Sequence, residues 1–169
     1  MLIDAGARDR RSVQSTPNYG LIYRSRRLDR DVAIAGAIRM ISHVQSSCPD
    51  TDFVAKLIEL APDGRATLSM DGVTRAMYRG PSGEPLHLIP GQVERLTVHF
   101  GDIYYTFRAG YRIEVDLTSG NFPRRARNND SSHAILVADD DDDICIAINT
   151  IHHDEPTPSF VELPMLTGR

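Results

Sequence analysis

Tryptophan is absent from the 169 residues, cysteine occurs only twice, and aromatic residues make up 7% of the chain. Two cysteines do not imply the disulfide framework of a small secreted domain. Cys48 lies beside a turn-like Pro-Asp pair and Cys145 inside an apolar run, so we expect Cys145 to be a plain core residue. This cysteine usage favours a reducing, cytoplasmic setting.

Long apolar runs and a strong charge of one sign are also missing. No stretch approaches the roughly 20 apolar residues of a membrane span, and the N-terminus lacks the apolar core of a signal peptide. The net charge is -4, and the basic clusters at residues 24–30 and 124–127 are short and flanked by acids. We therefore expect neither a membrane contact nor a nucleic-acid surface, which needs clustered positive charge.

The length sets the domain organisation. A chain of 169 residues can form one domain with a core, but it is too short to add a second large domain. Residues 1–18 are polar, charged and aperiodic, which predicts an N-terminal tail or linker. One domain is expected over residues 19–169.

Short segments with period-two alternation recur along this domain. Arg112 to Thr118 alternates so regularly that one face is expected to be buried and the other wet. Residues 95–100 and 52–60 alternate in the same manner. Residues 37–44 and 144–151 carry apolar side chains at both odd and even positions, so that both faces of each segment are apolar. This pattern predicts strands that are covered on both sides.

Turn residues separate these segments. Asp63-Gly64 and Asp71-Gly72 bracket a predicted strand at residues 66–70, and the Pro- and Gly-rich stretch 81–90 predicts a loop. Many short strands with turns between them, and almost no helical period, predict an all-β fold of two sheets, a jelly-roll β-sandwich.

Residues for nucleophilic catalysis are poorly arranged. The Gly-x-Ser-x-Gly elbow of an α/β-hydrolase is absent, and Ser82 and Ser119 have the wrong spacing of neighbouring glycines. Cys48 could pair with His43 or His133, but a reactive thiol needs an electropositive pocket and a positioned base. We therefore expect no catalytic residue in this chain.

Two segments resemble metal sites superficially. His152-His153-Asp154 is expected to be extended, so successive side chains point to opposite faces and both histidines cannot readily bind one ion. The five consecutive aspartates at Asp139–Asp143 lack the alternating ligands and the glycine of a calcium loop. We expect no metal site and no cofactor, and the aspartate run is expected to be a solvated turn.

A series of short motifs occurs in a fixed order along the chain. The first part of the series consists of Ser46–Phe53 ("S-S-x-x-D-T-D-F"), Ala55–Leu57 ("A-K-L"), Pro62–Arg65 ("P-D-G-R") and Asp71–Ala76 ("D-G-x-x-R-A"). The second part consists of Leu88–Gly91, Phe107–Ile113, Ser119–Arg124, Ile151–Asp154, Pro158-Ser159 and Val161–Pro164. In this order the motifs resemble the C-terminal domain of the X-Pro dipeptidyl-peptidase, cocaine esterase and alpha-amino-acid ester hydrolase family of serine hydrolases. The match runs from about Asp9 to Pro164, and one departure is Tyr111, where the family usually has histidine.

The resemblance implies a galactose-binding-like jelly roll whose catalytic triad lies in a preceding α/β-hydrolase domain, so no catalytic residue carries over. It implies a non-catalytic domain that packs on that hydrolase domain, in the same chain or supplied separately, and supports its active-site entrance or oligomer contacts. The sequence does not distinguish a trimmed chain from an orphan C-terminal half. An exposed apolar patch is expected where the partner docks.

Two other functions remain open from the sequence. The first is a stand-alone carbohydrate- or small-ligand-binding module, for which Tyr104, Tyr105 and Tyr111 are the clustered aromatic candidates. The second is an independent enzyme. Its candidate residues are His43, His99, His133, His152 and His153.

Overall fold

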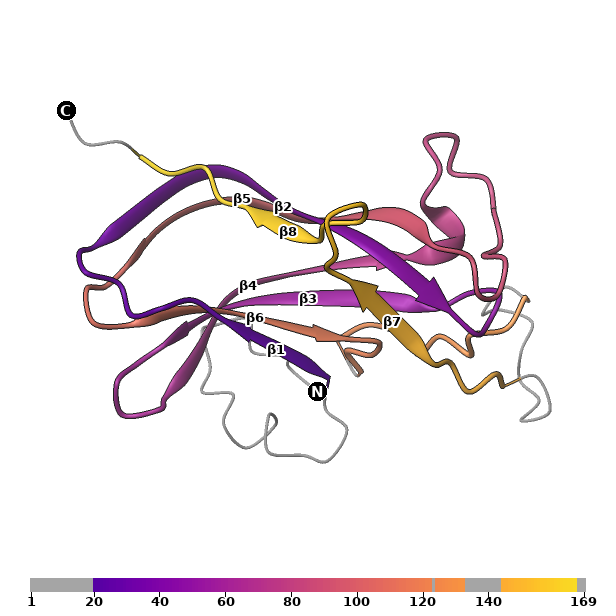
Figure 1. Cartoon of the computed structure of the whole chain (residues 1–169), viewed down its shortest axis with the longest axis horizontal. Helices are drawn as coiled ribbons and strands as arrows, with labels where there is room; N and C mark the ends of the chain where they lie inside the picture. Colours follow the sequence, from indigo (N-terminus) through magenta and orange to yellow (C-terminus); the bar gives the residue numbers. More distant parts are fainter. Residues whose placement is uncertain (1–19, 123, 133–143, 167–169) are drawn as a thin grey trace.

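The chain forms a β-sandwich in a computed structural model that describes residues 20–122, 124–132 and 144–166 (Figure 1). These residues form eight strands and one short 3-10 helix, with no α-helix among them. No helix in the described part is long and apolar enough to cross a membrane. The predicted tail at 1–18, His133 and the Asp139–Asp143 run lie outside the described residues.

The eight strands form two antiparallel sheets. Sheet A has the order β1-β6-β3-β4, with β1 at Leu21–Arg24, β6 at Arg112–Thr118, β3 at Asp52–Leu60 and β4 at Ala66–Arg75. Sheet B has the order β5-β2-β7, with β5 at Glu94–Phe107, β2 at Val32–Ser46, β7 at Asn149–His152, and β8 at Phe160–Glu162 also pairing with β2. The 3-10 helix η1, Ala76–Tyr78, follows β4. The all-β class and the two-sheet sandwich are confirmed, whereas the jelly-roll and galactose-binding-like assignments stay predictions.

The core lies between the two sheets. Alternate residues of the long strands β2 and β5 point inward, and Ile34, Ile38, Leu96, Val98 and Phe107 are at most 1% exposed. Burying an aliphatic or aromatic side chain of this size contributes about 1.5–3 kcal/mol. The predicted strands at 37–44, 52–60 and 95–100 are therefore confirmed, and residues 81–90 form a loop.

The strand at Arg112–Thr118 is confirmed as β6, but its predicted wet face is wrong. Glu114 and Asp116 have no exposed surface. β6 lies between β1 and β3 in the interior of sheet A, and Arg24 forms an ion pair with Glu114. A charged side chain can be buried when it has an ionic partner. The alternating pattern predicted the strand correctly, but it did not predict that the polar side chains on its outer face are buried.

The predicted turn at Asp71-Gly72 is also wrong, because β4 continues through it to Arg75. A Cβ atom on Gly72 would lie 2.4 Å from the carbonyl oxygen of His99 on β5. Thr74 donates a hydrogen bond to the carbonyl oxygen of Thr97 at 2.8 Å. Glycine at position 72 thus allows β4 and β5 to approach closely and closes one side of the sandwich.

The prediction that residues 144–151 form a covered strand is only partly right. β7 begins at Asn149, and the side chains of Ile144, Ile146 and Ile148 are 55%, 87% and 73% exposed. This segment continues β7 at the edge of sheet B, where no neighbouring strand covers it in the described part of the chain. Apolar residues at both odd and even positions therefore do not prove that both faces of a strand are buried.

Cys145 is not a plain core cysteine as expected. It forms a disulfide with Cys48, and their Cα atoms are 6.2 Å apart across 97 residues of sequence. The bridge fastens the segment that precedes β7 to the loop that follows β2. The pairing could not be predicted from the sequence, because the residues around each cysteine do not indicate that the two lie close together in the fold.

Candidate functional site

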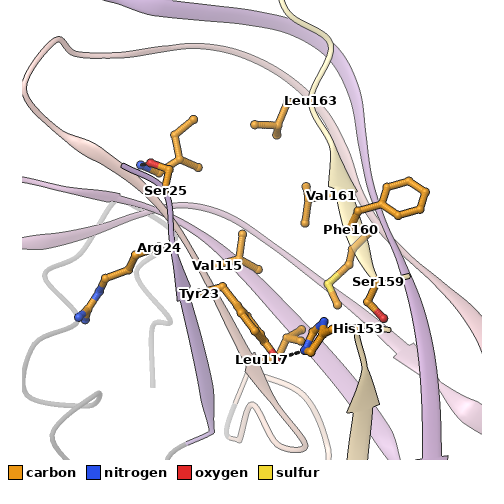
Figure 2. A pocket seen from close by; sticks show the side chains of 12 residues that line it. Tyr23, Arg24, Ser25, Val115, Leu117, His153, Ser159, Phe160, Val161 and Leu163 are labelled. Carbon is orange, nitrogen blue, oxygen red and sulfur yellow. Dashed lines mark hydrogen bonds between the residues drawn. The ribbon is translucent and has the colours of Figure 1, made fainter. Parts of the chain in front are cut away.

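A groove of about 340 Å³ lies on the open side of the sandwich, between β1 and β6 of sheet A and β8 of sheet B (Figure 2). We call it the β1–β8 groove. Its apolar lining comes from the inner faces of both sheets and consists of Met40, Ile113, Val115, Leu117, Val161 and Leu163. Side chains of this type belong in a domain core. The groove is therefore an exposed continuation of the core.

The open side lies between two short edge strands. β1 has four residues and β8 has three, and the two do not pair, whereas β4 and β5 approach closely on the closed side. A second hollow of about 320 Å³ lies on the same side, between Leu21 of β1 and Ile151 of β7. Leu21 and Phe160 are each 45% exposed along this side. A contiguous apolar surface of this kind is typical of an interaction site.

One polar contact crosses the mouth of the groove. The Tyr23 hydroxyl and His153 Nε2 are hydrogen-bonded at 2.7 Å, and the two rings meet edge-on with centroids 5.1 Å apart (Figure 2). Burial raises the pKa of Tyr23. Ser159, also at the groove, accepts a hydrogen bond from His43 N and donates one to His152 O. These polar groups hold neighbouring strands together and leave the groove mainly apolar.

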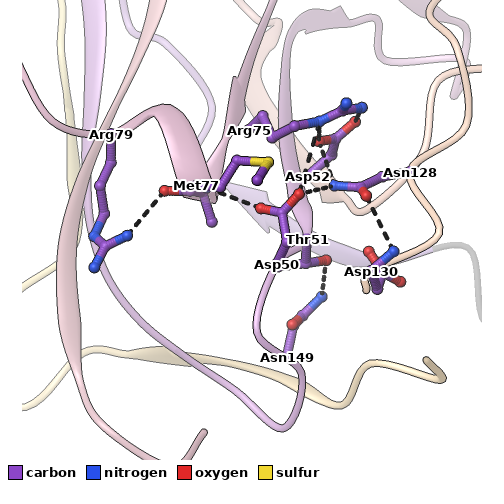
Figure 3. Close-up of polar contacts among 10 residues, drawn as sticks. Asp50, Thr51, Asp52, Arg75, Met77, Arg79, Asn128, Asp130 and Asn149 are labelled. Carbon is purple, nitrogen blue, oxygen red and sulfur yellow. Dashed lines mark hydrogen bonds and ion pairs between the residues drawn. The ribbon is translucent and has the colours of Figure 1, made fainter. Parts of the chain in front are cut away.

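A buried polar network lies at one end of the sandwich (Figure 3). Asp52 accepts two hydrogen bonds from the Arg75 guanidinium, at 2.8 and 3.1 Å. Asp50 accepts a hydrogen bond from Met77 N at 2.8 Å, and Asn128 Nδ2 donates to both Asp50 and Asp52 at 2.9 Å. The carboxylates therefore join the start of β3, the end of β4, η1 and the loop at 124–132.

Asp130 also belongs to this network, and its surroundings disfavour the charged form of its carboxyl group. Burial, followed by repulsion from Asp52 and Asp50, raises its pKa from 3.8 to about 6. Burial also raises the pKa of Asp50, although hydrogen bonds from Asn128 and Met77 oppose the rise. Asp130 adopts a left-handed backbone conformation with φ of 57°, which aspartate and asparagine tolerate better than most residues.

Sequence reasoning missed this network. The side chains of Asp50 and Asp52 bind Met77, Arg75 and Asn128. The two aspartates and the Arg-Ala pair at 75–76 are visible in the sequence. Their proximity is not, because only the tertiary fold brings these segments together. The network is a structural element, and no group of three or more His, Cys, Asp or Glu in the described residues is placed to hold a metal ion.

The candidate histidines are only partly brought together. His43 and His152 are opposite each other on β2 and β7, and His43 Nδ1 bonds the carbonyl oxygen of Pro158 at 2.9 Å. His152 Nε2 is buried without a hydrogen-bond partner in the described part of the chain. His153 contacts Tyr23 instead, and His99 is exposed on β5. No common site for these histidines is therefore formed among the described residues.

The candidate nucleophiles form no hydrogen bond with these histidines in the described part of the chain. Ser82 is exposed in the loop after η1 and its hydroxyl accepts a hydrogen bond from Glu84 N at 3.3 Å. Ser119 is exposed at the end of β6. Cys48 is bonded to Cys145 and has no free thiol. Among the hydrogen bonds of the described residues, none links Ser82 or Ser119 to a histidine.

The three candidate tyrosines do not form a flat binding platform. Tyr104 and Tyr105 are consecutive on β5 and point to opposite faces. Tyr104 is 75% exposed, whereas Tyr105 packs against Phe107 and donates a hydrogen bond to Glu59. Tyr111 lies under the Arg108 guanidinium. Packing and ion contacts thus occupy two of the three rings.

Comparisons with known proteins agree on one relationship. The sequence pattern of the X-Pro dipeptidyl-peptidase C-terminal non-catalytic domain matches residues 4–162. Cocaine esterase from Rhodococcus sp. (strain MB1 Bresler) is 31% identical over 163 residues, which cover 96% of this chain and 28% of the esterase. The chain therefore spans less than a third of that relative.

Solved structures show the same fold. An aminopeptidase from a marine sediment Thaumarchaeota archaeon superposes with a TM-score of 0.89 at 21% identity, covering 95% of this chain and 28% of the aminopeptidase. An alpha-amino acid ester hydrolase superposes with a TM-score of 0.88 at 24% identity, covering 95% of this chain and 27% of the hydrolase. In each protein most of the chain lies outside the matched region.

Proposed function

Because the chain belongs to the family of the X-Pro dipeptidyl-peptidase C-terminal non-catalytic domain, we propose that it packs on an α/β-hydrolase domain and supports its active-site entrance or its oligomer. The hydrolase domain is either part of the same polypeptide or a separate chain. Its chemistry would be hydrolysis of an ester or of an amino-terminal peptide bond, as the names of the relatives indicate.

The observation that carries this proposal is the β1–β8 groove. It partly exposes inner-face residues of both sheets, such as Val115 of β6 and Val161 of β8, at the side where β1 and β8 do not pair. Covering such a surface gains about 25 cal/mol per Å² of apolar area. A complex with a partner that has a complementary apolar ridge would therefore be stabilised, because the ridge would cover the core residues exposed in the groove.

A chimera of cocaine esterase tests the proposal. In it, the region of the Rhodococcus esterase that matches this chain is replaced by this chain. The chimera is expected to hydrolyse an ester substrate and to show one cooperative thermal transition for both parts. Tyr23→Glu and Phe160→Glu each place a charge at the groove and are expected to lower the temperature at which esterase activity is lost.

Tyr104→Glu is the matched control, because Tyr104 is exposed on β5 at the opposite edge of sheet B. It is expected to leave the inactivation temperature unchanged. Equal inactivation temperatures for all three variants and the parent chimera would contradict docking at the groove. Loss of the thermal transition in the isolated variants would instead report a folding defect.

A carbohydrate-binding module is not favoured by any specific observation. Tyr104 is the most exposed candidate ring, and it is in none of the ring pairs found among the described residues. The β1–β8 groove is mainly apolar, which does not suit a ligand rich in hydroxyl groups.

The disulfide bears on the compartment. The sequence favoured the cytoplasm, but disulfides are rare in reducing cytosol and persist in oxidising compartments. We therefore propose that the chain with its Cys48–Cys145 bridge works in an oxidising compartment. Mass analysis after alkylation of the protein isolated from its native cells tests this. Two alkylated cysteines would contradict it.

A further inference from the structure

Both cysteines of the disulfide lie next to the buried carboxylate network. Cys48 comes two residues before Asp50, one of the carboxylates of the network. Cys145 N donates a hydrogen bond to Asn129 O at 2.9 Å. Asn129 belongs to the loop at 124–132, whose side chains contribute to the network in Figure 3. Through Cys145, the disulfide therefore ties this loop to the segment that carries Asp50.

Other contacts hold the loop at 124–132 only weakly. Its one apolar side chain, Ala126, is exposed, and no residue of the loop belongs to a strand. Asn128 Nδ2 donates hydrogen bonds to Asp50 and Asp52, each at 2.9 Å. A hydrogen bond contributes little net stability, because water competes for the same groups. The loop therefore has polar contacts to the sandwich but no hydrophobic anchor in the core.

Charge acts against the position of this loop. Burial, followed by repulsion from Asp52 and Asp50, raises the pKa of Asp130 to about 6, and Arg75 opposes the rise. Above that pH, three carboxylates share Arg75 as a counter-ion, so the ionised Asp130 is repelled by its two acidic neighbours. A covalent link is suited to hold a loop in place against such repulsion.

The segment that contains Cys145 is also weakly held. The three isoleucines between residues 144 and 148 are all more than half exposed, so this segment buries little apolar surface. Ser47 N donates to Ile148 O at 3.1 Å, and Ile148 N donates to Ser47 Oγ at 2.9 Å. These two bonds lie three residues beyond Cys145. The position of Cys145 therefore depends on the disulfide and on the loop that it contacts.

We propose that the Cys48–Cys145 disulfide is a redox-sensitive switch that keeps the loop at 124–132 on Asp50 and Asp52, and that reduction by a dithiol releases this loop. In the oxidised form the network is complete and buried. In the reduced form polar contacts alone join the loop to the sandwich, and repulsion among the carboxylates favours its release.

The reduction is a thiol–disulfide exchange. Cys48 has no exposed surface, whereas Cys145 is partly exposed, so a thiolate of the reductant attacks Cys145 Sγ. The S–S bond breaks, and Cys48 Sγ takes its electron pair and a proton from solvent. The second thiolate of the reductant then attacks the reductant sulfur of the mixed disulfide, and Cys145 leaves and takes up a proton. Two cysteine thiols and one oxidised reductant result.

Release of the loop changes the surface at one end of the sandwich. Asp50, Thr51 and Asp52 are at most 5% exposed in the oxidised form. Without the loop, the two carboxylates gain contact with solvent beside Arg75. The β1–β8 groove has no residue from 46–52 or 124–132 in its described lining, so the switch does not depend on docking there.

Titration of the aspartate carboxyl groups by nuclear magnetic resonance tests the switch in the full chain, before and after reduction with dithiothreitol. In the oxidised form Asp130 is expected to titrate with a midpoint of about 6, and its resonance is identified by its loss in Asp130→Asn. After reduction the midpoint is expected to fall toward the ordinary pKa of 3.8, because burial and repulsion are relieved.

Hydrogen–deuterium exchange measures release of the loop itself. Amides of residues 46–52 and 124–132 are expected to exchange at least about tenfold faster after reduction, whereas amides of β5 keep their rate. Cys145→Ser is expected to behave as the reduced form, and dithiothreitol is expected to change neither of its readouts. Ile146→Ser is the matched control, because Ile146 is 87% exposed in the same segment and the variant keeps the disulfide.

Intact mass after alkylation confirms that both thiols are free in the reduced sample. In that sample, an unchanged Asp130 midpoint or unchanged exchange at residues 124–132 would overturn the proposal. Faster exchange in every strand, with loss of the β-sheet signal in circular dichroism, would overturn it as well. The disulfide would then hold the whole fold instead of one loop.

Discussion

At the scale of single residues, the carboxylates at the end of the sandwich give the most specific consequences. Asp130 and Asp50 both have pKa values raised chiefly by burial, while Arg75 neutralises Asp52. A carboxyl group whose pKa is higher in the folded than in the unfolded state binds protons more tightly when folded. The stability that it contributes is therefore present at low pH and is lost as pH rises.

For Asp130 the loss falls between its ordinary pKa of 3.8 and about 6. The substitution Asp130→Asn removes the titrating group and introduces an amide side chain of a residue type that tolerates positive φ. The variant is expected to be about 1–2 kcal/mol more stable than the wild type above pH 7, after allowance for solvent screening. Urea unfolding at pH 5 and pH 7.5 measures this, and a wild-type stability that rises across that interval as much as the variant's would contradict it.

Gly72 is the residue on which the closed side depends. Gly72→Ala forces a Cβ atom into the carbonyl group of His99, with a cost of about 1–3 kcal/mol for overpacking. Gly120→Ala is the control, because a Cβ atom there meets nothing within 4 Å. Thermal unfolding of the two variants is expected to separate them. Equal midpoints would show that β4 and β5 are not in close contact.

At the scale of elements, the disulfide fixes the segment before β7 to the loop after β2. Cys145→Ser is expected to lower the free energy of unfolding by about 2–4 kcal/mol. Reduction of the wild-type chain by dithiothreitol is expected to lower it by a similar amount, and to leave Cys145→Ser unaffected. Unfolding curves with and without the reductant provide the measurement. A wild-type curve insensitive to reduction would mean that the bridge does not form.

Sequence patterns predicted those elements whose signal is local. The strands β2, β3 and β6 have alternating or continuous apolar residues, and the loop at 81–90 has its prolines and glycines. The errors arose where contact with a segment distant in the sequence determines whether a residue is buried or lies in a strand. Arg24 allows Glu114 to be buried, and His99 explains Gly72 as a site of close approach instead of a turn. Neither contact is visible within a window of neighbouring residues.

The candidate site was less predictable than the strands. A docking surface was expected, but its position depends on which edges of the two sheets lie opposite each other unpaired, and no local sequence pattern predicts this. The candidate catalytic and sugar-binding residues had been chosen by chemical type. Among the described residues, the fold forms no hydrogen bond between Ser82 or Ser119 and a histidine, and it turns Tyr104 and Tyr105 to opposite faces.

At the scale of the whole molecule, the chain is one β-sandwich with a closed side and an open side. The closed side is sealed by β4 and β5, and the open side exposes the β1–β8 groove. A domain with an incompletely covered core gains stability when another surface completes it. Docking of a hydrolase domain at the groove, as proposed above, would supply such a surface.

A non-catalytic chain has no serine activated for attack on an acyl group. Treatment with a fluorophosphonate, which captures activated serines, is therefore expected to leave the intact mass of the isolated chain unchanged. The cocaine esterase chimera is expected to gain one adduct, on a serine of the esterase part. A stoichiometric adduct on the isolated chain would identify a nucleophile that the described residues do not reveal.

Hydrogen–deuterium exchange tests docking at the groove most directly, by comparing this chain alone with the same chain inside the chimera. The account predicts that amides of Leu21–Arg24 and Phe160–Glu162 exchange at least about tenfold more slowly in the chimera, because the hydrolase domain covers both edges. The exposed β5 edge around Tyr104 is expected to keep its exchange rate. Unchanged exchange at β1 and β8 in an active chimera would contradict the account.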